Sequence, residues 1–368
     1  MYMMYKNYSR LERWLHYSVL HSNLVRKFSF DLERIFFSSK SQSGSQVESV
    51  YICGLARSGT TILLKILDNT DTFRSLMYRD MPFVMAPNLW MLLSGFNKRE
   101  LTLRERTHAD GIFVNQDSPE AFEEIFWQTF DNPSEGKSYD IALPSDQTLK
   151  KFSQYKSLLV FTKKAKNKVA STKRYLSKNN NNLLRLQSLH DDDPSSLIFL
   201  VYRDPLATAR SLHRQHLRFL EMQRDELFIS KYMGWLGHHE FGVGHKPFHF
   251  AIPYMTNSLN TDSLDYWLDY WNAVYQYLIL HHLNQVRLVH HESMCYEPRD
   301  FLCNLFEVAN LDKKLLEDSA KEIKPIKKVH FDDSGFSIKL VQKAYNTYNQ
   351  MLNHKKNIYI SKIALNDF

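Results

Sequence analysis

Residues 47–67 read VESVYICGLARSGTTILLKIL, and this stretch decides the class of fold. Its first seven residues form a short apolar run, rich in β-branched side chains, that stops at Gly54 as a buried strand does. After Thr60 the apolar residues recur with the period of a helix. The stretch therefore predicts a strand, a tight glycine loop and a helix in succession.

A second unit of the same kind follows later in the chain. Residues 197–202 (LIFLVY) form another apolar run, which Arg203, Asp204 and Pro205 close before a helical segment at 206–216. Two strand–loop–helix units imply a parallel sheet covered by its crossover helices. We expect an α/β fold, a three-layer, P-loop-type parallel sheet flanked by helices, with helical additions at both ends.

Length and composition set the domain organisation. The 368 residues, of which 43% are hydrophobic, suffice for one large core. We divide the chain into a helical N-terminal extension with a linker (1–46), a main P-loop domain (47–330) and a C-terminal helical segment packed on that domain (331–368). The first residues contain neither a signal-peptide core nor a long apolar span, so we expect no transmembrane segment.

Cysteine usage and charge narrow the setting further. Cys53, Cys295 and Cys303 lack metal-ligand spacing and fit a reducing compartment, so we expect a cytoplasmic protein. The net charge of +7 favours an anionic partner. The stretch from Lys163 to Arg185 carries eight basic and no acidic residues, which fits either an anion-facing surface or an ordinary solvated face.

The loop after the first strand has the residues of an anion site. Gly54 and Gly59 let backbone N–H groups turn inward, and the helix N-terminus adds its positive end. Hydroxyl donors stand at Ser58, Thr60 and Thr61. Thr60 occupies the position of the lysine of nucleoside-triphosphatases, and the cation is instead Arg57. A cation inside the loop suits a phosphosulfate, whose bridging oxygen gains negative charge as the S–O bond breaks.

Two segments together resemble one known family. CGLARSGTT (53–61) is similar to the 5′-phosphosulfate-binding loop of sulfotransferases that use 3′-phosphoadenosine 5′-phosphosulfate (PAPS), in the variant with Arg. Arg203, which follows the second strand, and Ser211, on the next helix, resemble that family's 3′-phosphate site. Lys178 lies in a segment similar to the one that precedes that site.

The resemblance implies a sulfotransferase that moves a sulfuryl group from PAPS to a hydroxyl or amine of a glycan, lipid or small metabolite. It implies an anionic nucleotide donor, no metal and no nucleic-acid partner. Such an in-line displacement needs a cation at the leaving phosphate and a base for the acceptor's proton. We expect Arg57 to be the cation, and Lys178 to assist it or to bind the acceptor. For the base, the resemblance points to Asp80 first, and His108 is the second candidate.

Each of these candidates also has a structural interpretation. Asp80 fits a helix cap or an ion pair with Arg79. The acids of SPEAFEEI (118–125) fit the first turn of a helix with Pro119 at its first position. HHEFGVGHKPFH (238–249) lacks the spacing of a helical zinc motif, so we expect an acceptor-site loop rather than a metal site. The aromatic residues between 266 and 275 recur at helical spacing and favour core packing.

Two other functions stay open at this level. A P-loop nucleotide-dependent phosphotransferase or kinase shares the loop but would be expected to carry a lysine at position 60. A non-catalytic polyanion-binding protein would use the basic stretch at 163–185 and would tolerate changes at Asp80 and His108. The acceptor, the oligomeric state and the pathway do not follow from these motifs.

Overall fold

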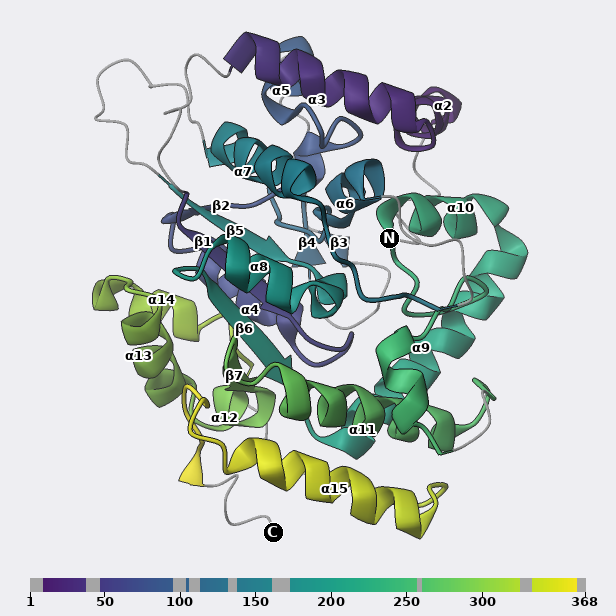
Figure 1. The fold of residues 1–368 in the computed structure, drawn as a ribbon, viewed down its shortest axis with the longest axis vertical. Coiled ribbons are helices and arrows are strands. Elements are labelled where there is room, and N and C mark those ends of the chain that lie inside the picture. Colours follow the sequence, from purple (N-terminus) through teal and green to yellow (C-terminus); the bar gives the residue numbers. More distant parts are fainter. Residues whose placement is uncertain are drawn as a thin grey trace.

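The structure is a computed structural model, and it describes residues 9–37, 47–94, 104–105, 113–131, 138–160, 173–256, 260–324 and 333–362. A five-stranded parallel sheet lies at its centre, in the order β2-β5-β1-β6-β7 (Figure 1). Its strands are β1 (Ser49–Cys53), β2 (Phe73–Arg74), β5 (Arg174–Lys178), β6 (Leu197–Tyr202) and β7 (Arg287–His290). Two further strands, β3 (Arg104–Glu105) and β4 (Phe113–Val114), pair separately and antiparallel. The expected parallel α/β sheet is confirmed.

Alternation along the central strand divides the core into two halves. Val50 and Ile52 point into one apolar cluster, and Tyr51 and Cys53 point into the other, because successive strand residues face opposite sides of the sheet. All five residues of β1 are buried, as a strand covered on both faces requires. The sheet therefore forms the middle layer of three.

Helices cover both faces. The smaller cluster lies beneath α4 (Thr60–Asp68), α12 (His291–Tyr296) and α13 (Pro298–Val308). The other elements that follow the sheet or join its strands are α5 (Pro87–Leu93), α6 (Glu124–Phe130), α7 (Asp146–Val160), α8 (Leu186–Asp192), α9 (Pro205–Asp225), α10 (Leu227–Leu236), α11 (Leu264–His281), α14 (Leu316–Ala320) and α15 (Ile338–Leu352). Short 3₁₀ turns are η1 (Tyr78–Asp80), η2 (Asn180–Leu184), η3 (His249–Tyr254) and η4 (Lys313–Leu315). The C-terminal helix α15 packs against α11.

The predicted N-terminal helices are present as α2 (Arg10–Leu20) and α3 (Asn23–Phe37). Ser9 and Glu12 close the start of α2 with a reciprocal pair of hydrogen bonds, the arrangement that fixes a helix N-terminus. In Figure 1 both helices lie at the end of the molecule opposite α15. The predicted linker at 38–46 lies outside the described residues.

The second predicted unit folds as its turn residues require. Asp204 caps α9 by accepting a hydrogen bond from the Ala207 N–H at 2.8 Å, and Pro205 is the first helical residue. The sequence also favours, more weakly, short strands at 174–177 and 286–290, and the structure contains them as β5 and β7. The aromatic series of α11 is buried in the core, as its spacing predicted.

One helix prediction is wrong. We expected a helix to begin at Pro119, with acids in its first turn, but α6 begins at Glu124. Pro119 instead forms an isolated bridge with Met77, and the Glu120 N–H donates to the Leu76 carbonyl at 3.0 Å. Pairing with a distant segment overrides the local signal here.

Among the helices of the described residues, none is both long enough and apolar enough to cross a membrane.

Candidate active site

The loop between β1 and α4 turns back on itself through unusual backbone angles. Gly54 and Gly59 have φ values of 150° and 100°, and a side chain at either position would collide with Val201 or His291. Arg57 has φ of 72°, which an L-residue with a long side chain rarely adopts. Strain of this kind is retained where a site needs the side chain, so the loop is held in a shape that serves function.

Two sequence-distant segments meet at this loop. The Nε of Arg57 donates a hydrogen bond to the Oγ of Ser211 on α9 at 3.0 Å. The Nη1 of Arg203, which follows β6, donates to the Arg57 carbonyl at 3.4 Å. Three of the residues that the motifs singled out are thus in direct contact, because β1 and β6 are neighbours and both end at the same edge of the sheet.

Arg203 is anchored from behind by a buried polar cluster. Its Nε lies 3.7 Å from a carboxylate oxygen of Glu292, whose second oxygen lies 3.0 Å from His290. Burial opposes the charge of Glu292, but His290 outweighs it and holds the pKa at about 2. Burial, with Glu292 nearby, raises the pKa of Asp204 to about 7. Glu292 is therefore the fixed negative partner that orients Arg203.

His291 closes the far side of the loop. Its imidazole lies against Gly59, and burial, with Arg203 adding to it, lowers its pKa to about 4. A neutral ring at this position adds no positive charge to the loop. His291 therefore places an uncharged ring beside Gly59.

A cavity opens from the loop. It has an empty volume of about 590 Å³, open solvent included. One part of its wall is polar or charged and another is apolar; its lining residues are Ala56, Arg57, Thr60, Thr61, Glu120, Lys178, Asn180, Phe219, Met233, His238, Glu240 and Phe241. The cation of the loop, the hydroxyls at the start of α4 and Lys178 at the end of β5 therefore share one space.

Glu120 is the carboxylate of this cavity that faces the loop residues. It is 8% exposed, and its Oε2 accepts a hydrogen bond from the Tyr78 hydroxyl at 2.7 Å. Its Oε1 accepts from the Ala121 N–H at 2.9 Å. The two hydrogen-bond donors favour the charged form of the Glu120 carboxylate. Because Glu120 lines the cavity, this carboxylate can accept a proton from a molecule bound there.

A second carboxylate in the cavity belongs to the loop at 238–249. The Glu240 Oε2 lies 3.5 Å from the Nδ1 of His238, and its Oε1 accepts from Asn180 at 3.3 Å. Burial opposes the charge of Glu240, but His238 and Lys178 outweigh it and hold its pKa well below the ordinary value. The loop predicted to form the acceptor site thus lines the cavity, and His238 and Lys178 hold Glu240 in its charged form there.

Asp80 does not line the cavity. Both of its oxygens lie 3.0 Å from the Nη2 of Arg74, and its Oδ2 accepts from the Met77 N–H at 2.8 Å. Its ion pair is with Arg74 rather than with Arg79, which pairs with Asp117. A carboxylate neutralised in this way fits the structural interpretation of Asp80 better than the catalytic one.

Three other sequence predictions have different outcomes in the structure. His108, the second candidate base, lies outside the described residues. The Ser58 hydroxyl donates to the Leu55 carbonyl at 2.7 Å within the loop, which is a structural use of that group. The described part of the basic stretch is not one surface, because Arg185 is buried and Lys178 faces the cavity.

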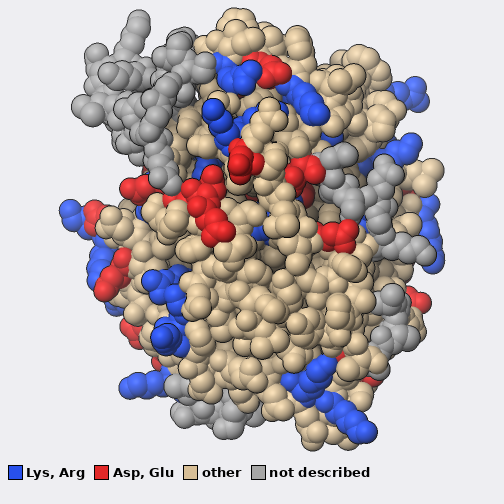
Figure 2. All heavy atoms as spheres, viewed as in Figure 1, with Lys and Arg blue, Asp and Glu red and all other residues tan. Residues whose placement is uncertain are grey.

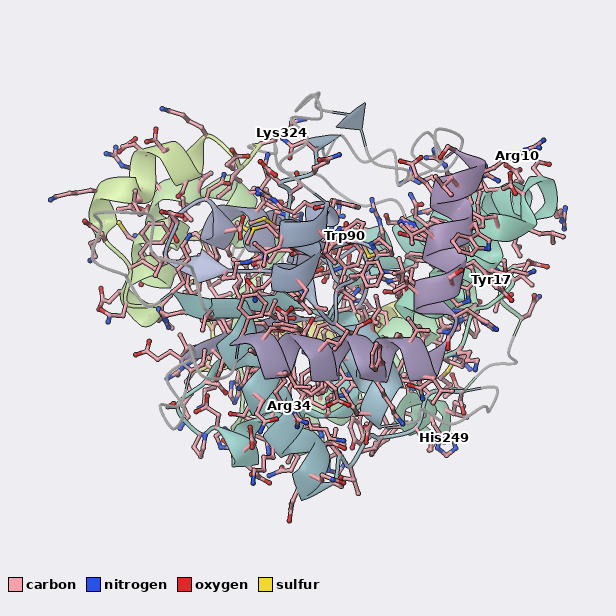
Figure 3. All side chains as sticks on the ribbon, turned by 90° about the horizontal axis from the view of Figure 1, so that it is seen from above. Arg10, Tyr17, Arg34, Trp90, His249 and Lys324 are labelled. Carbon is pink, nitrogen blue, oxygen red and sulfur yellow. The ribbon has the colours of Figure 1, made fainter. Side chains whose placement is uncertain are left out.

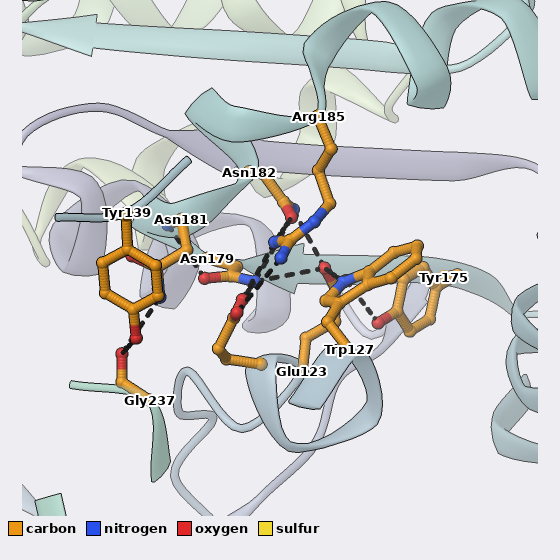
Figure 4. Close-up of polar contacts among 10 residues, drawn as sticks. Glu123, Trp127, Tyr139, Tyr175, Asn179, Asn181, Asn182, Arg185 and Gly237 are labelled. Atoms are coloured by element: carbon orange, nitrogen blue, oxygen red, sulfur yellow. Dashed lines mark hydrogen bonds and ion pairs between the residues drawn. The ribbon is translucent and has the colours of Figure 1, made fainter. Parts of the chain in front are cut away.

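A buried polar network supports the cavity wall (Figure 4). The Arg185 guanidinium forms a fork with Glu124, at 2.9 and 3.1 Å, and lies over the Trp127 ring. Both partners are almost fully buried. Asn179 donates to Glu124 at 2.8 Å, so the end of β5 is tied to α6 directly after Lys178.

The same network reaches the loop at 238–249. The Asn181 amide donates to the Gly237 carbonyl at 3.0 Å, and the Tyr139 hydroxyl also donates to it (Figure 4). Gly237 ends α10 in the left-handed conformation, directly before His238. Lys178 and His238 therefore directly adjoin residues of one buried hydrogen-bond network.

Sequence reasoning assigned Glu120 to the first turn of a helix and did not single out Asn180. The signal that favours Glu120 is its position after Pro119, which cannot donate to a ladder and so marks a strand-like edge as readily as a helix start. Among the described residues, no group of three or more His, Cys, Asp or Glu side chains is placed to hold a metal ion.

Neither a protein-family model nor a curated protein matches the sequence. Solved structures do match, and several sulfotransferases are among them. The chain is similar to sulfotransferase STF1 from Mycobacterium tuberculosis H37Rv at 12% identity, over 89% of this chain and 83% of that one, with a TM-score of 0.48. It is similar to STF9 from Mycobacterium avium at 12% identity, over 94% and 87%, with a TM-score of 0.49.

A sulfotransferase from Alicyclobacillus acidocaldarius also matches, at 12% identity over 83% of this chain and 92% of that one, with a TM-score of 0.38.

Proposed function

We propose that the chain is a sulfotransferase that takes a sulfuryl group from PAPS and transfers it to a hydroxyl or amine of an acceptor. The observation that carries the proposal is the contact between Arg57 and Ser211, at 3.0 Å, with Arg203 bonded to the same loop. A donor with phosphate groups at two ends needs two neighbouring anion sites. The loop at 54–61 and the pair formed by Arg203 and Ser211 are such neighbours.

The residues present fit that donor. Arg57, Thr60 and Thr61 line the cavity with a guanidinium and two hydroxyls, which are groups that bind phosphate and sulfate oxygens. The buried Nε of Arg203 has no hydrogen-bond partner in the structure, although Glu292 stands near it. A 3′-phosphate would supply the acceptor atoms that this guanidinium lacks.

The reaction needs charge control at both ends of the transferred group. PAPS supplies an activated sulfuryl group when it is bound. Glu120 is assigned the base: it accepts the proton of the acceptor's hydroxyl or amine as the new bond to sulfur forms. Arg57 is assigned the role of stabilising the negative charge that develops on the leaving phosphate oxygen as the old S–O bond breaks. Lys178 faces the same cavity and supports either task.

Calorimetry with 3′-phosphoadenosine 5′-phosphate, the desulfated donor, tests the donor site. We expect micromolar binding by the wild-type protein and at least tenfold weaker binding by Arg57→Ala and by Arg203→Ala, because each removes charged hydrogen bonds. Arg299→Ala is the matched control, since Arg299 is exposed on α13 and pairs with Glu317. Adenosine 5′-phosphate, which lacks one end, is expected to bind more weakly.

Two outcomes would count against the proposal. Tight binding of ATP with Mg²⁺ and indifference to the 3′-phosphate would favour a phosphotransferase. Equal binding by the three arginine variants would mean that the nucleotide does not use this loop. A sulfuryl-transfer assay with PAPS and a panel of alcohols and amines then identifies the acceptor.

A further inference from the structure

Large apolar side chains gather at one end of the molecule. Among the described residues, seventeen large apolar side chains are exposed, and eleven of them lie on neighbouring helices: three on α2, four on α3, three on α5 and one on α10. We call this surface the apolar end. Its most prominent members are Leu11, Trp14, Leu24, Phe28, Ile35 and Leu93. Trp14 is 63% exposed and Leu24 is 80% exposed.

The outward side chains follow helical stripes. On α3, Leu24, Phe28 and Ile35 recur at intervals that place them on one face, while Phe30 and Phe37 on the opposite face are buried in the core. A surface helix ordinarily presents polar residues outward. An apolar stripe on both sides of α3 therefore indicates that the outer side also has a partner.

The helices of the apolar end are joined to one another. The buried carboxylate of Glu33 accepts hydrogen bonds from the Asn88 and Leu89 N–H groups, both at 2.9 Å, and so ties α3 to the start of α5. Arg13 on α2 bonds Glu226, directly before α10, at 3.3 Å. Figure 3 looks down on this end, with α2, α3 and Trp90 of α5 toward the viewer. The helices therefore present their apolar residues as one connected surface.

The charges on the same helices are suited to an anionic surface. Arg10 and Lys27 are exposed on α2 and α3, next to the apolar stripes. Figure 2 shows Lys and Arg together with Asp and Glu near the upper edge of the molecule, where α3 lies in the same view; on α3 the exposed Asp31 pairs with Arg34. Trp14 and Tyr17 are side chains that favour the boundary between headgroups and acyl chains. Apolar residues, aromatic residues and flanking cations together match an interfacial membrane helix.

We propose that the apolar end docks on a lipid bilayer with anionic headgroups, α2 and α3 lying in its surface. A second copy of this chain is the poorer partner, because a two-fold interface would set this basic surface against its own copy. Docking is peripheral, since no helix of the described chain qualifies as a membrane span. The inference does not depend on the reaction, because none of the exposed side chains that define the apolar end lines the cavity.

Vesicle flotation of the full chain tests the docking surface. We expect binding to vesicles of equal parts phosphatidylcholine and phosphatidylglycerol, and much weaker binding to phosphatidylcholine alone. Trp14→Ser with Phe28→Ser is expected to weaken binding at least about tenfold. Lys27→Gln is expected to weaken it about fivefold. The matched control is Leu280→Ser with Ile338→Ser, which removes two equally exposed apolar side chains from α11 and α15.

Several results would overturn the proposal. They are failure of the wild-type protein to float with the anionic vesicles, equal binding to both vesicle types, or equal loss in the control variant. Sedimentation equilibrium without lipid examines the second copy: a dimer that Trp14→Ser with Phe28→Ser dissociates would replace the bilayer as the partner. If that double variant proves unfolded by circular dichroism, Lys27→Gln and the two vesicle types still decide the question.

Discussion

Asp80 and Glu120 are two buried carboxylates on segments that run side by side, and they meet opposite surroundings. The two segments are joined by backbone hydrogen bonds, from Tyr78 to Ser118 and from Glu120 to Leu76. Asp80 faces the guanidinium of Arg74, which neutralises it. Glu120 accepts hydrogen bonds from the Tyr78 hydroxyl and the Ala121 N–H, and it lines the cavity. Burial alone therefore does not distinguish the two carboxylates; access to the cavity does.

The largest expected effect separates these two carboxylates by rate. Glu120→Gln removes the proposed base but keeps the shape of the side chain. We expect the rate constant of sulfuryl transfer to fall roughly thousandfold, equivalent to about 4 kcal/mol, while binding of the desulfated donor stays unchanged. Initial rates with PAPS, alongside calorimetry, measure both. A variant with wild-type rate would remove Glu120 from the mechanism.

The next effect separates them by stability. Asp80→Asn leaves the partly buried charge of Arg74 without its counter-ion, so we expect a loss of about 3 kcal/mol in the free energy of unfolding. Urea denaturation measures this loss, and the transfer rate per folded molecule is expected to stay within a few-fold of wild type. Asp80→Leu combined with Arg74→Met should recover part of the stability, because no unpaired charge remains. A thousandfold loss of rate in Asp80→Asn would restore Asp80 as the base.

The smallest expected effect tests the hydrogen bond that Tyr78 donates to Glu120. Tyr78→Phe deletes the hydroxyl that donates to Glu120 at 2.7 Å and changes little else. That hydrogen bond favours the charged carboxylate, so its loss should move the acid limb of the pH–rate profile to higher pH and lower the rate a few-fold near neutrality. Rates measured across pH report the shift. An unmoved acid limb would mean that Glu120 does not set it.

The parts of the fold that the sequence predicts are those in which a local pattern agrees with the tertiary structure. The strand at 197–202 coincides with β6, and the helix at 338–352 coincides with α15. Asp204 and Pro205 begin α9 as their turn chemistry requires. In each case hydrophobic periodicity and capping, which act over a few residues, decide the outcome.

The loop of the proposed donor site was predictable for the same reason, and the proposed base was not. Glycines and hydroxyls that cradle an anion are consecutive in the chain, so the loop at 54–61 carries its own signal. Glu120 reaches the cavity only because residues near Pro119 pair with Met77, a contact that no local pattern encodes. The acid-rich run after Pro119 fits a helix start equally well, and helix propensity is a weak prior that tertiary pairing overrides.

The hydrogen bond between Arg57 and Ser211 joins the two halves of the proposed anion site. A ligand that binds only one half would have to break this bond without offering a new partner to the residue in the other half. A ligand with anionic groups at both ends offers a new partner to both residues. In the proposed donor site, this bond therefore disfavours small anions such as free sulfate and phosphate and favours a molecule that spans both halves.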